Sequence, residues 1–363
     1  MLLVTDAASL PHPVDVVPGA LATLGARVAA AAPAHRYAIV TDSTVGPLYA
    51  ARARASFAAD ARVTVLTVPA GEHHKTRESW ARLTDELLDA GHGRDTTVVA
   101  LGGGVVGDLA GFVAATFMRG VPFVQAPTTL LAMIDASIGG KTGVDTPAGK
   151  NLVGAFHQPA AVVIDPELLA TLPLPQLRAG LAEAIKHGVI ADERYYERVA
   201  EDLPALLAAG GATSEAMRRL IERSVAIKAG VVARDEREGG VRKILNFGHT
   251  LGHAVEHVSG YALLHGEAVA VGMALESELA ERLGLAACGT HAQLCATLER
   301  AGLPTARPAD LAPDDLLAAT RGDKKARGGA VEYALPRRVG AMAGEGSGWA
   351  VAVPDAVVRE VLA

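Results

Sequence analysis

The sequence contains little cysteine and no long apolar run. Cys288 and Cys295 are the only cysteines among 363 residues, too few for a disulfide framework and at no metal-binding spacing, so buried thiols in a reducing compartment are expected. No apolar run approaches the roughly 18 residues of a membrane span, and no charged start precedes an apolar segment as in a signal peptide. These absences favour a cytoplasmic protein without a membrane partner.

The chain also has no block of like charge. Its net charge is -6, half of its residues are hydrophobic and 20% are charged, as in a globular protein with proper cores. An acidic chain without basic clusters is a poor partner for nucleic acid or an anionic membrane. Any bound phosphate must therefore be held by local basic residues.

Lysine and asparagine are scarce. Arginine outnumbers lysine 26 to 8, and Asn151 and Asn246 are the only asparagines. We interpret the remaining ones as kept where chemistry requires them, and chance survival on the surface is the alternative. The lysines that lie beside other polar residues are Lys141, Lys150, Lys186 and Lys228.

Strands and helices alternate over the first part of the chain. Strands are expected at 36–41, 62–68, 96–101 and 121–126, and helices at 20–31, 45–59 and from the turn at 69–72 to 90. This alternation predicts an α/β domain over 1–165 with a doubly wound, mostly parallel, Rossmann-like sheet.

The pattern becomes helical after residue 165. Helices are expected at 176–192, 193–207, 214–234, 243–258, 266–283 and 291–301. A polar turn at 322–329, an extended segment at 331–335 and a short final helix follow. We therefore predict a second, mainly α domain over 166–363.

A glycine-rich turn follows the apolar run at 96–101. Gly102, Gly104 and Gly107 satisfy G-x-G-x-x-G, and a helix is expected from 109 to 117. Glycines allow backbone N–H groups to approach a phosphate at a helix start, although ordinary α/β turns also use them. The turn follows a third or fourth strand and no acid lies about 20 residues beyond it, so a bound nucleotide would sit in a variant arrangement.

Histidines recur at every fourth residue in one predicted helix. His249, His253 and His257 share a helix face that could chelate zinc, but the H-E-x-x-H glutamate of zinc proteases is absent. His265 begins the next predicted helix, and Glu183 precedes Lys186 by three residues. A surface ion pair and a capping histidine are the alternatives, and spacing alone leaves the choice of ligands open. Glu72 and Lys75 are interpreted as an acidic residue at a helix start and its ion-pair partner three residues later.

Several ordered motifs together carry a family resemblance. Besides the glycine turn, they are 135–143 (DASIGGKTG), 149–151 (GKN), 182–186 (AEAIK), 246–253 (NFGHTLGH) and 265–267 (HGE). The chain resembles the 3-dehydroquinate synthases, of the sugar phosphate cyclase group, from about residue 42 to 325.

The resemblance implies a set of site residues. The metal, zinc or cobalt, would be bound by Glu183, His249 and His265, with His253 contacting substrate and His257 structural. NAD would be held by Asp42, Glu72, Lys75, Gly103, Gly104, Val105, Asp108, Thr128, Thr129, Lys150 and Thr171; Thr44 stands where the family often has asparagine. The substrate-pocket residues would be Arg119, Asp135, Lys141, Asn151, Lys186, Lys228, Arg242, Asn246 and His253, with Lys324 or Lys325 as a late basic contact.

The resemblance also implies the reaction. The family's substrate is 3-deoxy-D-arabino-heptulosonate 7-phosphate, which is transiently oxidised at C5 by NAD with help from the metal. Phosphate elimination, return of the hydride, ring opening and an internal aldol closure follow, so NAD is needed only in catalytic amounts. Asp135, Lys141, Asn246 and His253 are the expected catalytic residues, with Asp135 ionised and His253 exchanging a proton with the C5 oxygen. A homodimer is expected.

Three other functions are compatible with parts of this pattern. A sister cyclase of the 2-deoxy-scyllo-inosose or 2-epi-5-epi-valiolone synthase type would share the metal and NAD residues but bind no carboxylate. Lys228, Arg242 and Asn246 favour the synthase over it. A metal-dependent polyol dehydrogenase would release NADH stoichiometrically, and a non-catalytic nucleotide-binding module would bind no metal.

Overall fold

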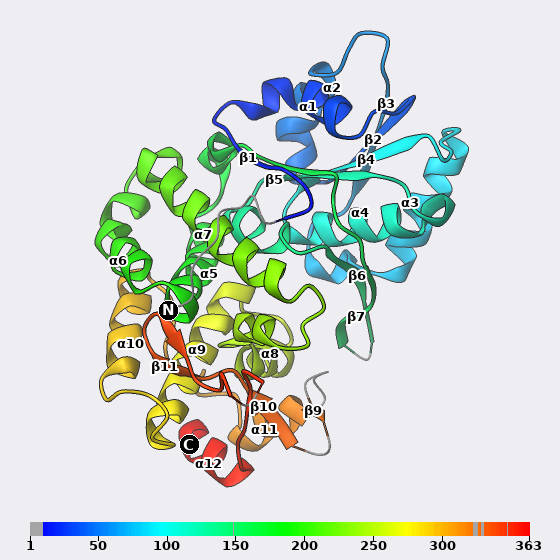
Figure 1. Cartoon of the computed structure of the whole chain (residues 1–363). Helices are drawn as coiled ribbons and strands as arrows, with labels where there is room; N and C mark the ends of the chain where they lie inside the picture. The colour runs from blue at the N-terminus through cyan, green and yellow to red at the C-terminus, as the bar shows by residue number, and fades with distance from the viewer. Residues whose placement is uncertain (1–9, 148, 322–325, 328–329, 347) are drawn as a thin grey trace. The chain divides into compact units, whose positions relative to one another are not determined.

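The computed structural model describes residues 10–147, 149–321, 326–327, 330–346 and 348–363 (Figure 1). The contacts divide the chain into two compact units. We call Ala7–Leu172 the N-terminal unit and Pro173–Ala363 the C-terminal unit. The boundary expected at 165 precedes the short helix η7 (Pro166–Thr171), which belongs to the N-terminal unit. Within the described part of the chain, no helix is both long enough and apolar enough to span a bilayer.

The N-terminal unit contains a six-stranded sheet whose strands are all parallel. Its order is β1-β8-β5-β4-β2-β3, which confirms the predicted parallel sheet. The strands are β1 (Val14–Val16), β2 (Arg36–Asp42), β3 (Arg62–Val68), β4 (Thr96–Gly102), β5 (Phe123–Pro127) and β8 (Ala161–Ile164).

Helices cover both faces of this sheet. Figure 1 shows α1 (Leu24–Ala31) and α2 (Ala51–Ala55) on one face, and α3 (Arg77–Asp89) and α4 (Gly104–Thr116) on the other. On the latter face, Val40 of β2 and Val98 of β4 share a buried cluster with Leu109 of α4. Alternate residues of a strand point to one face, so burial on both faces makes these strands almost continuously apolar.

Two predicted helix starts in this unit are wrong. α4 begins at Gly104 rather than at 109, so Gly104 and Gly107 lie in the helix and not in a loop. Gly107 lies against β5, because an added Cβ would be 2.9 Å from Oε1 of Gln125. α3 begins at Arg77 because the side chain of Thr76 accepts the N–H of Ser79 and caps the helix. Glu72 and Lys75 thus precede this helix, although they do form an ion pair.

An antiparallel hairpin that the sequence did not reveal completes the unit. It consists of β6 (Lys141–Thr146) and β7 (Gly149–Phe156), with a shift of register between Val144 and Thr146. Its glycines and polar residues hide the apolar alternation by which strands are recognised. Among the described strands, β7 pairs only with β6.

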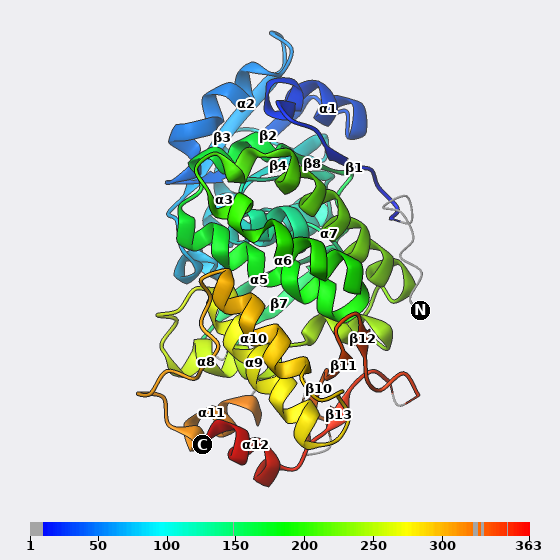
Figure 2. The same cartoon turned by 90° about the vertical axis from the view of Figure 1, so that its left-hand side faces the viewer.

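The C-terminal unit is mainly helical, as predicted (Figure 2). Its helices are α5 (Leu174–Ala191), α6 (Glu193–Leu207), α7 (Glu215–Arg234), α8 (His249–Val258), α9 (His265–Arg282), α10 (Thr290–Arg300), α11 (Pro313–Arg321) and α12 (Asp355–Leu362). Its short strands are β9 (Ala326–Arg327), β10 (Ala330–Tyr333), β11 (Pro336–Arg338), β12 (Ala341–Met342) and β13 (Val351–Ala352). Leu251 of α8, Leu275 of α9 and Leu316 of α11 belong to one buried cluster.

The structure corrects two predictions for this unit. The segment 243–258 is two elements, a 3-10 turn η9 (Val241–Asn246) and α8, because Gly248 has a φ of 77° that ends one and starts the other. Cys288 is exposed and Cys295 partly buried, so the expectation of two buried thiols is wrong. Lys324 and Lys325, in the predicted polar turn, lie outside the described residues.

Candidate active site

Close helix packing in the C-terminal unit brings the predicted metal ligands together. Gly266, beside His265 at the start of α9, lies directly on α5, where an added Cβ would overlap the carbonyl of Ala179. Ala179 is one helical turn before Glu183. The glycine therefore allows α9 to begin close enough to α5 for His265 to reach Glu183.

A second close approach places α8. An added Cβ at Gly272 of α9 would overlap the backbone carbonyl of Gly248, immediately before α8. The residue after Gly248 is His249, the first residue of α8. Two glycines of α9 thus fix the approach of the two neighbouring helices that carry Glu183 and His249.

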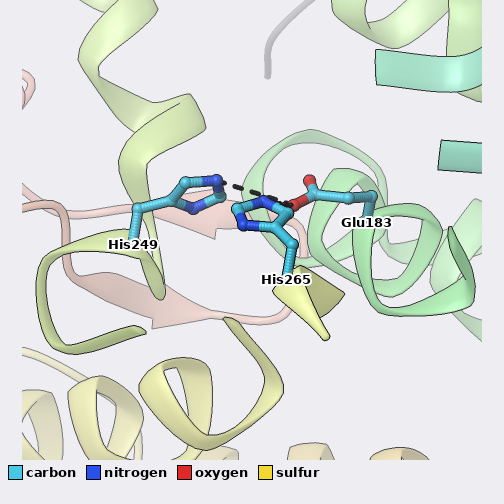
Figure 3. Close-up of side chains that lie close together, drawn as sticks. All are labelled: Glu183, His249 and His265. Carbon is cyan, nitrogen blue, oxygen red and sulfur yellow. Dashed lines mark ion pairs between the residues drawn. The ribbon is translucent and has the colours of Figure 1, made fainter. Parts of the chain in front are cut away.

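The three predicted ligands converge in space (Figure 3). Oε1 of Glu183 lies 3.6 Å from Nε2 of His249 and 3.5 Å from Nε2 of His265. One donor atom from each of the three residues lies within 4.8 Å of the other two. Glu183 is fully buried, while the histidine side chains are 12% and 32% exposed. A buried carboxylate and two partly open imidazoles suit a catalytic metal, which uses three protein ligands and open positions.

The Nδ1 atoms of both histidines have hydrogen-bond acceptors. These acceptors favour the tautomer with the proton on Nδ1, in which Nε2 can bind a metal. Nδ1 of His249 lies 3.1 Å from the carbonyl oxygen of Phe247, and Nδ1 of His265 lies 3.3 Å from Oε2 of Glu256. A carbonyl and a carboxylate can only accept, so each Nδ1–H donates and each Nε2 faces Glu183. Metal-bound histidines are commonly oriented in this way.

Acidic neighbours change the proton affinity of His265. Burial opposes its charge, but hydrogen bonds and charge interactions with Glu183 and Glu256 outweigh burial and raise its pKa to about 10. A metal ion that binds Nε2 must therefore displace a proton. The donor set fits a divalent cation, whose charge would replace that of the imidazolium.

Lys186 and His253 adjoin this group. Lys186 is 1% exposed and forms an ion pair with Oε2 of Glu183, so the alternative of a surface pair is wrong. The ring centroids of His253 and His249 are 5.2 Å apart. His257 is exposed, and its ring centroid lies 6.4 Å from that of Tyr261.

The other predicted substrate residues of this unit lie on α7 and η9. Lys228 and Arg242 are buried. Arg242 donates to the carbonyl of Glu236, and Nδ2 of Asn246 lies 2.6 Å from Oε1 of Glu238. Arg242 and Asn246 are thus tied to the loop that precedes η9.

The predicted NAD residues of the N-terminal unit lie where its strands end. Asp42 ends β2, Gly103 follows β4 and caps α4, and Thr128 follows β5. Because β2, β4 and β5 are adjacent and parallel, these ends share one edge of the sheet, where α/β folds bind ligands. Gly104 and Val105 form the first turn of α4, so their N–H groups suit an anion.

Two threonines and one aspartate at this edge differ in how their polar atoms are satisfied. Oγ1 of Thr128 is buried, and no hydrogen-bond partner for it exists in the described part of the protein. Thr129 accepts the N–H of Ala132, and Asp42 accepts the N–H groups of Thr44 and Val45. A buried hydroxyl without a protein partner fits a ligand oxygen.

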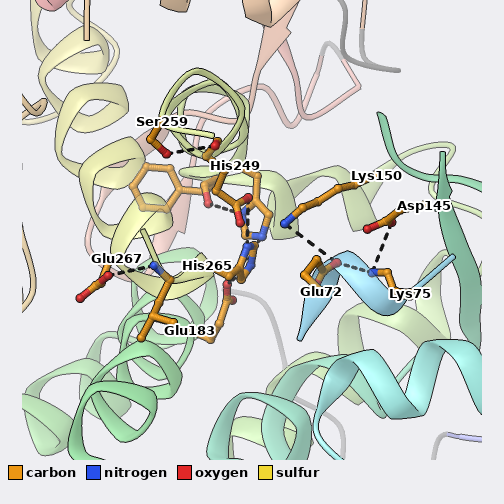
Figure 4. Close-up of polar contacts among 12 residues, drawn as sticks. Glu72, Lys75, Asp145, Lys150, Glu183, His249, Ser259, His265 and Glu267 are labelled. Atoms are coloured by element: carbon orange, nitrogen blue, oxygen red, sulfur yellow. Dashed lines mark hydrogen bonds and ion pairs between the residues drawn. The ribbon is translucent and has the colours of Figure 1, made fainter. Parts of the chain in front are cut away.

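Three carboxylates surround the buried ammonium of Lys75, and Figure 4 shows two of them, Glu72 and Asp145. Its Nζ lies 2.6 Å from Oε1 of Glu72, 3.3 Å from Oδ2 of Asp108 and 3.5 Å from Oδ1 of Asp145. Burial opposes its charge, but these carboxylates outweigh burial and raise its pKa. The opposite balance holds for Asp108, whose burial outweighs the attraction of Lys75 and raises its pKa to about 6. Nζ of Lys150 lies 3.9 Å from Oε1 of Glu72.

The other predicted residues of this unit lie on several elements. Arg119 is exposed, with a φ of 72°. Asp135 lies on the short helix η6 (Ala132–Ala136), and Lys141 and Asn151 lie on the hairpin. Thr171 ends η7, where its Oγ1 lies 2.6 Å from the hydroxyl of Tyr49.

Sequence reasoning missed three acidic residues that contact these groups. Glu256 accepts from His265, and Asp145 contacts Lys75. Glu276 is fully buried, and its two carboxylate oxygens accept the N–H groups of Gly248 and Leu251 at the start of α8. The available signal for Glu256 was its position seven residues after His249, two helical turns along the same helix. We find no local signal for the other two.

Comparisons with known proteins identify the family. Residues 65–179 match the family model of the 3-dehydroquinate synthase N-terminal domain, and residues 180–326 match the C-terminal one. A 3-dehydroquinate synthase from Symbiobacterium thermophilum is 50% identical over 332 residues, which cover 91% of this chain and 92% of that protein.

Two solved structures share the whole fold. One is 2-deoxy-scyllo-inosose synthase complexed with carbaglucose-6-phosphate, NAD+ and Co2+, with a TM-score of 0.87, 27% identity and coverage of 96% and 95% of the two chains. The other is 2-epi-5-epi-valiolone synthase from Streptomyces hygroscopicus subsp. jinggangensis with NAD+ and Zn2+ bound, with a TM-score of 0.86, 31% identity and coverage of 97% and 96%. The two matched family models and the similarity over nearly the whole chain place this protein in the 3-dehydroquinate synthase family.

Proposed function

We propose that this protein converts 3-deoxy-D-arabino-heptulosonate 7-phosphate to 3-dehydroquinate and phosphate in the shikimate pathway, which leads to aromatic amino acids. The observation that carries the proposal is the continuous match of residues 65–326 to both family models, with 50% identity to a 3-dehydroquinate synthase. The reaction releases phosphate without consuming NAD, so the enzyme is a lyase.

Glu183, His249 and His265 would hold one divalent metal, zinc or cobalt. Their convergence and the tautomers set by Phe247 and Glu256 support this assignment. When bound, the metal polarises an alcohol oxygen of the substrate and NAD supplies a reversible hydride acceptor. The side chains themselves orient these groups and balance their charge.

NAD would lie along the carboxyl edge of the parallel sheet. The first turn of α4, with Gly103, Gly104 and Val105, offers N–H groups to a phosphate, and Thr128 offers a buried hydroxyl. Additional polar contacts would come from Asp42, Glu72, Lys75, Asp108, Thr129, Lys150 and Thr171.

Cations and amides are the proposed substrate contacts. In the N-terminal unit they are Arg119, Lys141 and Asn151, and in the C-terminal unit they are Lys186, Lys228, Arg242 and Asn246. Each would form charge-assisted hydrogen bonds to phosphate or carboxylate. Lys324 or Lys325 would add a basic contact. His253 would hold or pass a proton, and Asp135 would accept a hydrogen bond from the substrate or a neighbouring cation.

A direct assay tests the proposal. The purified protein, loaded with NAD and Zn2+ or Co2+, is given 3-deoxy-D-arabino-heptulosonate 7-phosphate, and phosphate release is followed beside absorbance at 340 nm. We expect phosphate without net NADH. No phosphate release with either metal would contradict the proposal. His265→Ala should abolish turnover, whereas a nucleotide-binding module would be unaffected.

The same assay distinguishes the alternatives. Turnover only of sugar phosphates that lack a carboxylate would indicate a sister cyclase, although the two solved cyclases are only 27% and 31% identical to this chain. Stoichiometric NADH from a polyol would indicate a dehydrogenase. Neither alternative accounts for the 50% identity to a 3-dehydroquinate synthase.

We also propose a homodimer that uses the outer edge of β7. Leu152, Val153 and Phe156 of this strand are 42%, 38% and 51% exposed. Leu152 and Phe156 share one face because side chains alternate along a strand. An apolar edge strand readily pairs with another chain, and a second copy of the hairpin would cover it.

Light scattering of the protein after size-exclusion chromatography tests the dimer. We expect a dimer for the wild type and a folded monomer for the double variant Leu152→Asp/Phe156→Asp. A monomeric wild type would contradict the dimer, and a dimeric double variant would contradict this interface. We also propose that the protein is cytoplasmic, since both cysteines are free. Cell fractionation would test this location.

A further inference from the structure

Asp145 occupies an irregular position in the hairpin. Val144 pairs with Val153 and Thr146 with Gly149, so the register shift falls on Asp145. Such bulges re-aim a side chain and are common beside functional sites. The N–H of Asp145 donates to the carbonyl of Lys75 at 2.7 Å, so its backbone joins the hairpin to the segment that carries Lys75.

One oxygen of this side chain contacts two proposed binding residues. Oδ1 of Asp145 lies 2.8 Å from the backbone N of Asn151 and 3.5 Å from Nζ of Lys75. Asn151 has a φ of 53°, a left-handed conformation that is uncommon outside glycine although asparagine tolerates it. The hydrogen bond therefore helps to hold Asn151 in this conformation.

The two contacts compete for the same negative charge. An ammonium beside Oδ1 weakens the attraction of that oxygen for the N–H of Asn151, and withdrawal of the ammonium strengthens it. Glu72 and Asp108 give Lys75 other anionic partners, so a ligand that shifts Lys75 toward itself or toward them would leave Oδ1 to Asn151.

We propose that Asp145 is a positioning residue that couples the binding of NAD to the binding of the phosphorylated substrate. NAD binding at Lys75 strengthens the hydrogen bond from Asn151 to Asp145, which holds Asn151 in place and so strengthens substrate binding. The inference rests on the proposed function, since it takes Lys75 as an NAD contact and Asn151 as a substrate contact. Thermodynamic linkage requires the reciprocal effect, so a phosphate ligand must strengthen NAD binding by the same factor.

Calorimetric titration of the metal-loaded protein with NAD, with and without saturating inorganic phosphate, measures this coupling. We expect phosphate to lower the Kd for NAD of the wild type by about fivefold or more. Asp145→Asn keeps an oxygen for Asn151 but removes the charge that Lys75 senses, so its coupling factor should fall close to one. Asp145→Ala should also lose coupling. Asp60→Asn, at an exposed turn of the same unit, should keep the wild-type factor.

Thermal unfolding separates coupling from folding. A residue that only braced the hairpin would lower the unfolding temperature in Asp145→Asn without changing the coupling factor. Wild-type coupling in either folded Asp145 variant, or no coupling in the wild type, would overturn the proposal. Phosphate release by the wild type is measured in parallel, so an active enzyme without coupling refutes only this inference. An inactive enzyme refutes the proposed function.

Discussion

Substitution of Gly248 by alanine should destabilise the C-terminal unit by an amount that the local geometry sets. The φ of this residue is 77°, and a left-handed conformation costs a non-glycine residue about 1–2 kcal/mol. Reduced freedom of the unfolded chain returns about 0.5 kcal/mol. Strain alone therefore accounts for a net loss of about 1 kcal/mol.

Crowding adds to the strain at this position. An added Cβ would lie 2.9 Å from the carbonyl oxygen of Val269 and 3.0 Å from the backbone N of Met273, and it would overlap the Met273 side chain. The side chain can move, but the α9 backbone is held in its helix. Overpacking of this kind costs about 1–3 kcal/mol, so the total for Gly248→Ala is about 3 kcal/mol.

Gly284 offers a matched control in the same unit. Its φ is 66°, but no atom lies within 4 Å of an added Cβ, so Gly284→Ala carries the strain without the crowding. At about 2–4 °C per kcal/mol for a unit of this size, the unfolding temperature should fall by about 3 °C in the control and about 9 °C in Gly248→Ala. Calorimetry on both variants measures the difference. Equal unfolding temperatures would refute the view that close packing against α9 fixes the start of α8.

Three further predictions concern charges in the two units. Glu256→Gln weakens the acceptor that orients His265, so zinc affinity measured by chelator competition should fall about 10- to 100-fold; unchanged affinity would show that the backbone alone orients the ring. Zinc at about 100 times its Kd should stabilise the C-terminal unit by about 2.7 kcal/mol, and Glu183→Gln should abolish the zinc-induced rise in unfolding temperature. The same rise in this variant would show that the metal binds elsewhere. Because the folded pKa of Asp108 is raised to about 6, its ionisation opposes folding. The unfolding temperature of the wild type should fall relative to Asp108→Asn between about pH 4 and 6 and then run parallel; a gap that grows above pH 6 would contradict the assignment.

The helices and strands were predictable wherever burial produces a regular pattern of apolar residues in the sequence. Strand 62–68 was predicted with the bounds of β3, and 36–41 differs from β2 by one residue. β2 is buried on both faces and nearly continuously apolar, whereas β3, at the sheet edge, is recognised by its β-branched residues. The hairpin has no such pattern, since half-exposed glycine-rich strands have little apolar alternation. The glycines at 102–107 led to a wrong prediction of a loop. Gly107 lies in α4 and allows close packing on Gln125.

The metal residues were only partly predictable. Spacing placed His249 and His253 on one helix face, but it cannot reveal that Glu183 lies 3.5 Å from His265, 82 positions later in the chain. That distance depends on where α9 crosses α5. The sequence feature that bears on this crossing is Gly266, which allows α9 to lie directly on Ala179 of α5. The family resemblance supplied the choice of ligands that spacing left open.

In each unit a buried lysine lies against one or more carboxylates. Lys186 balances the fully buried Glu183 in one unit, and Lys75 balances three carboxylates in the other. Removing one partner of a buried ion pair costs about 3–5 kcal/mol, because the other charge stays buried without compensation. A lysine variant would thus lose activity through disorder of its carboxylates even if the lysine never touched a ligand. Roles for Lys75 and Lys186 must therefore be assigned from ligand affinities of folded variants and not from lost turnover.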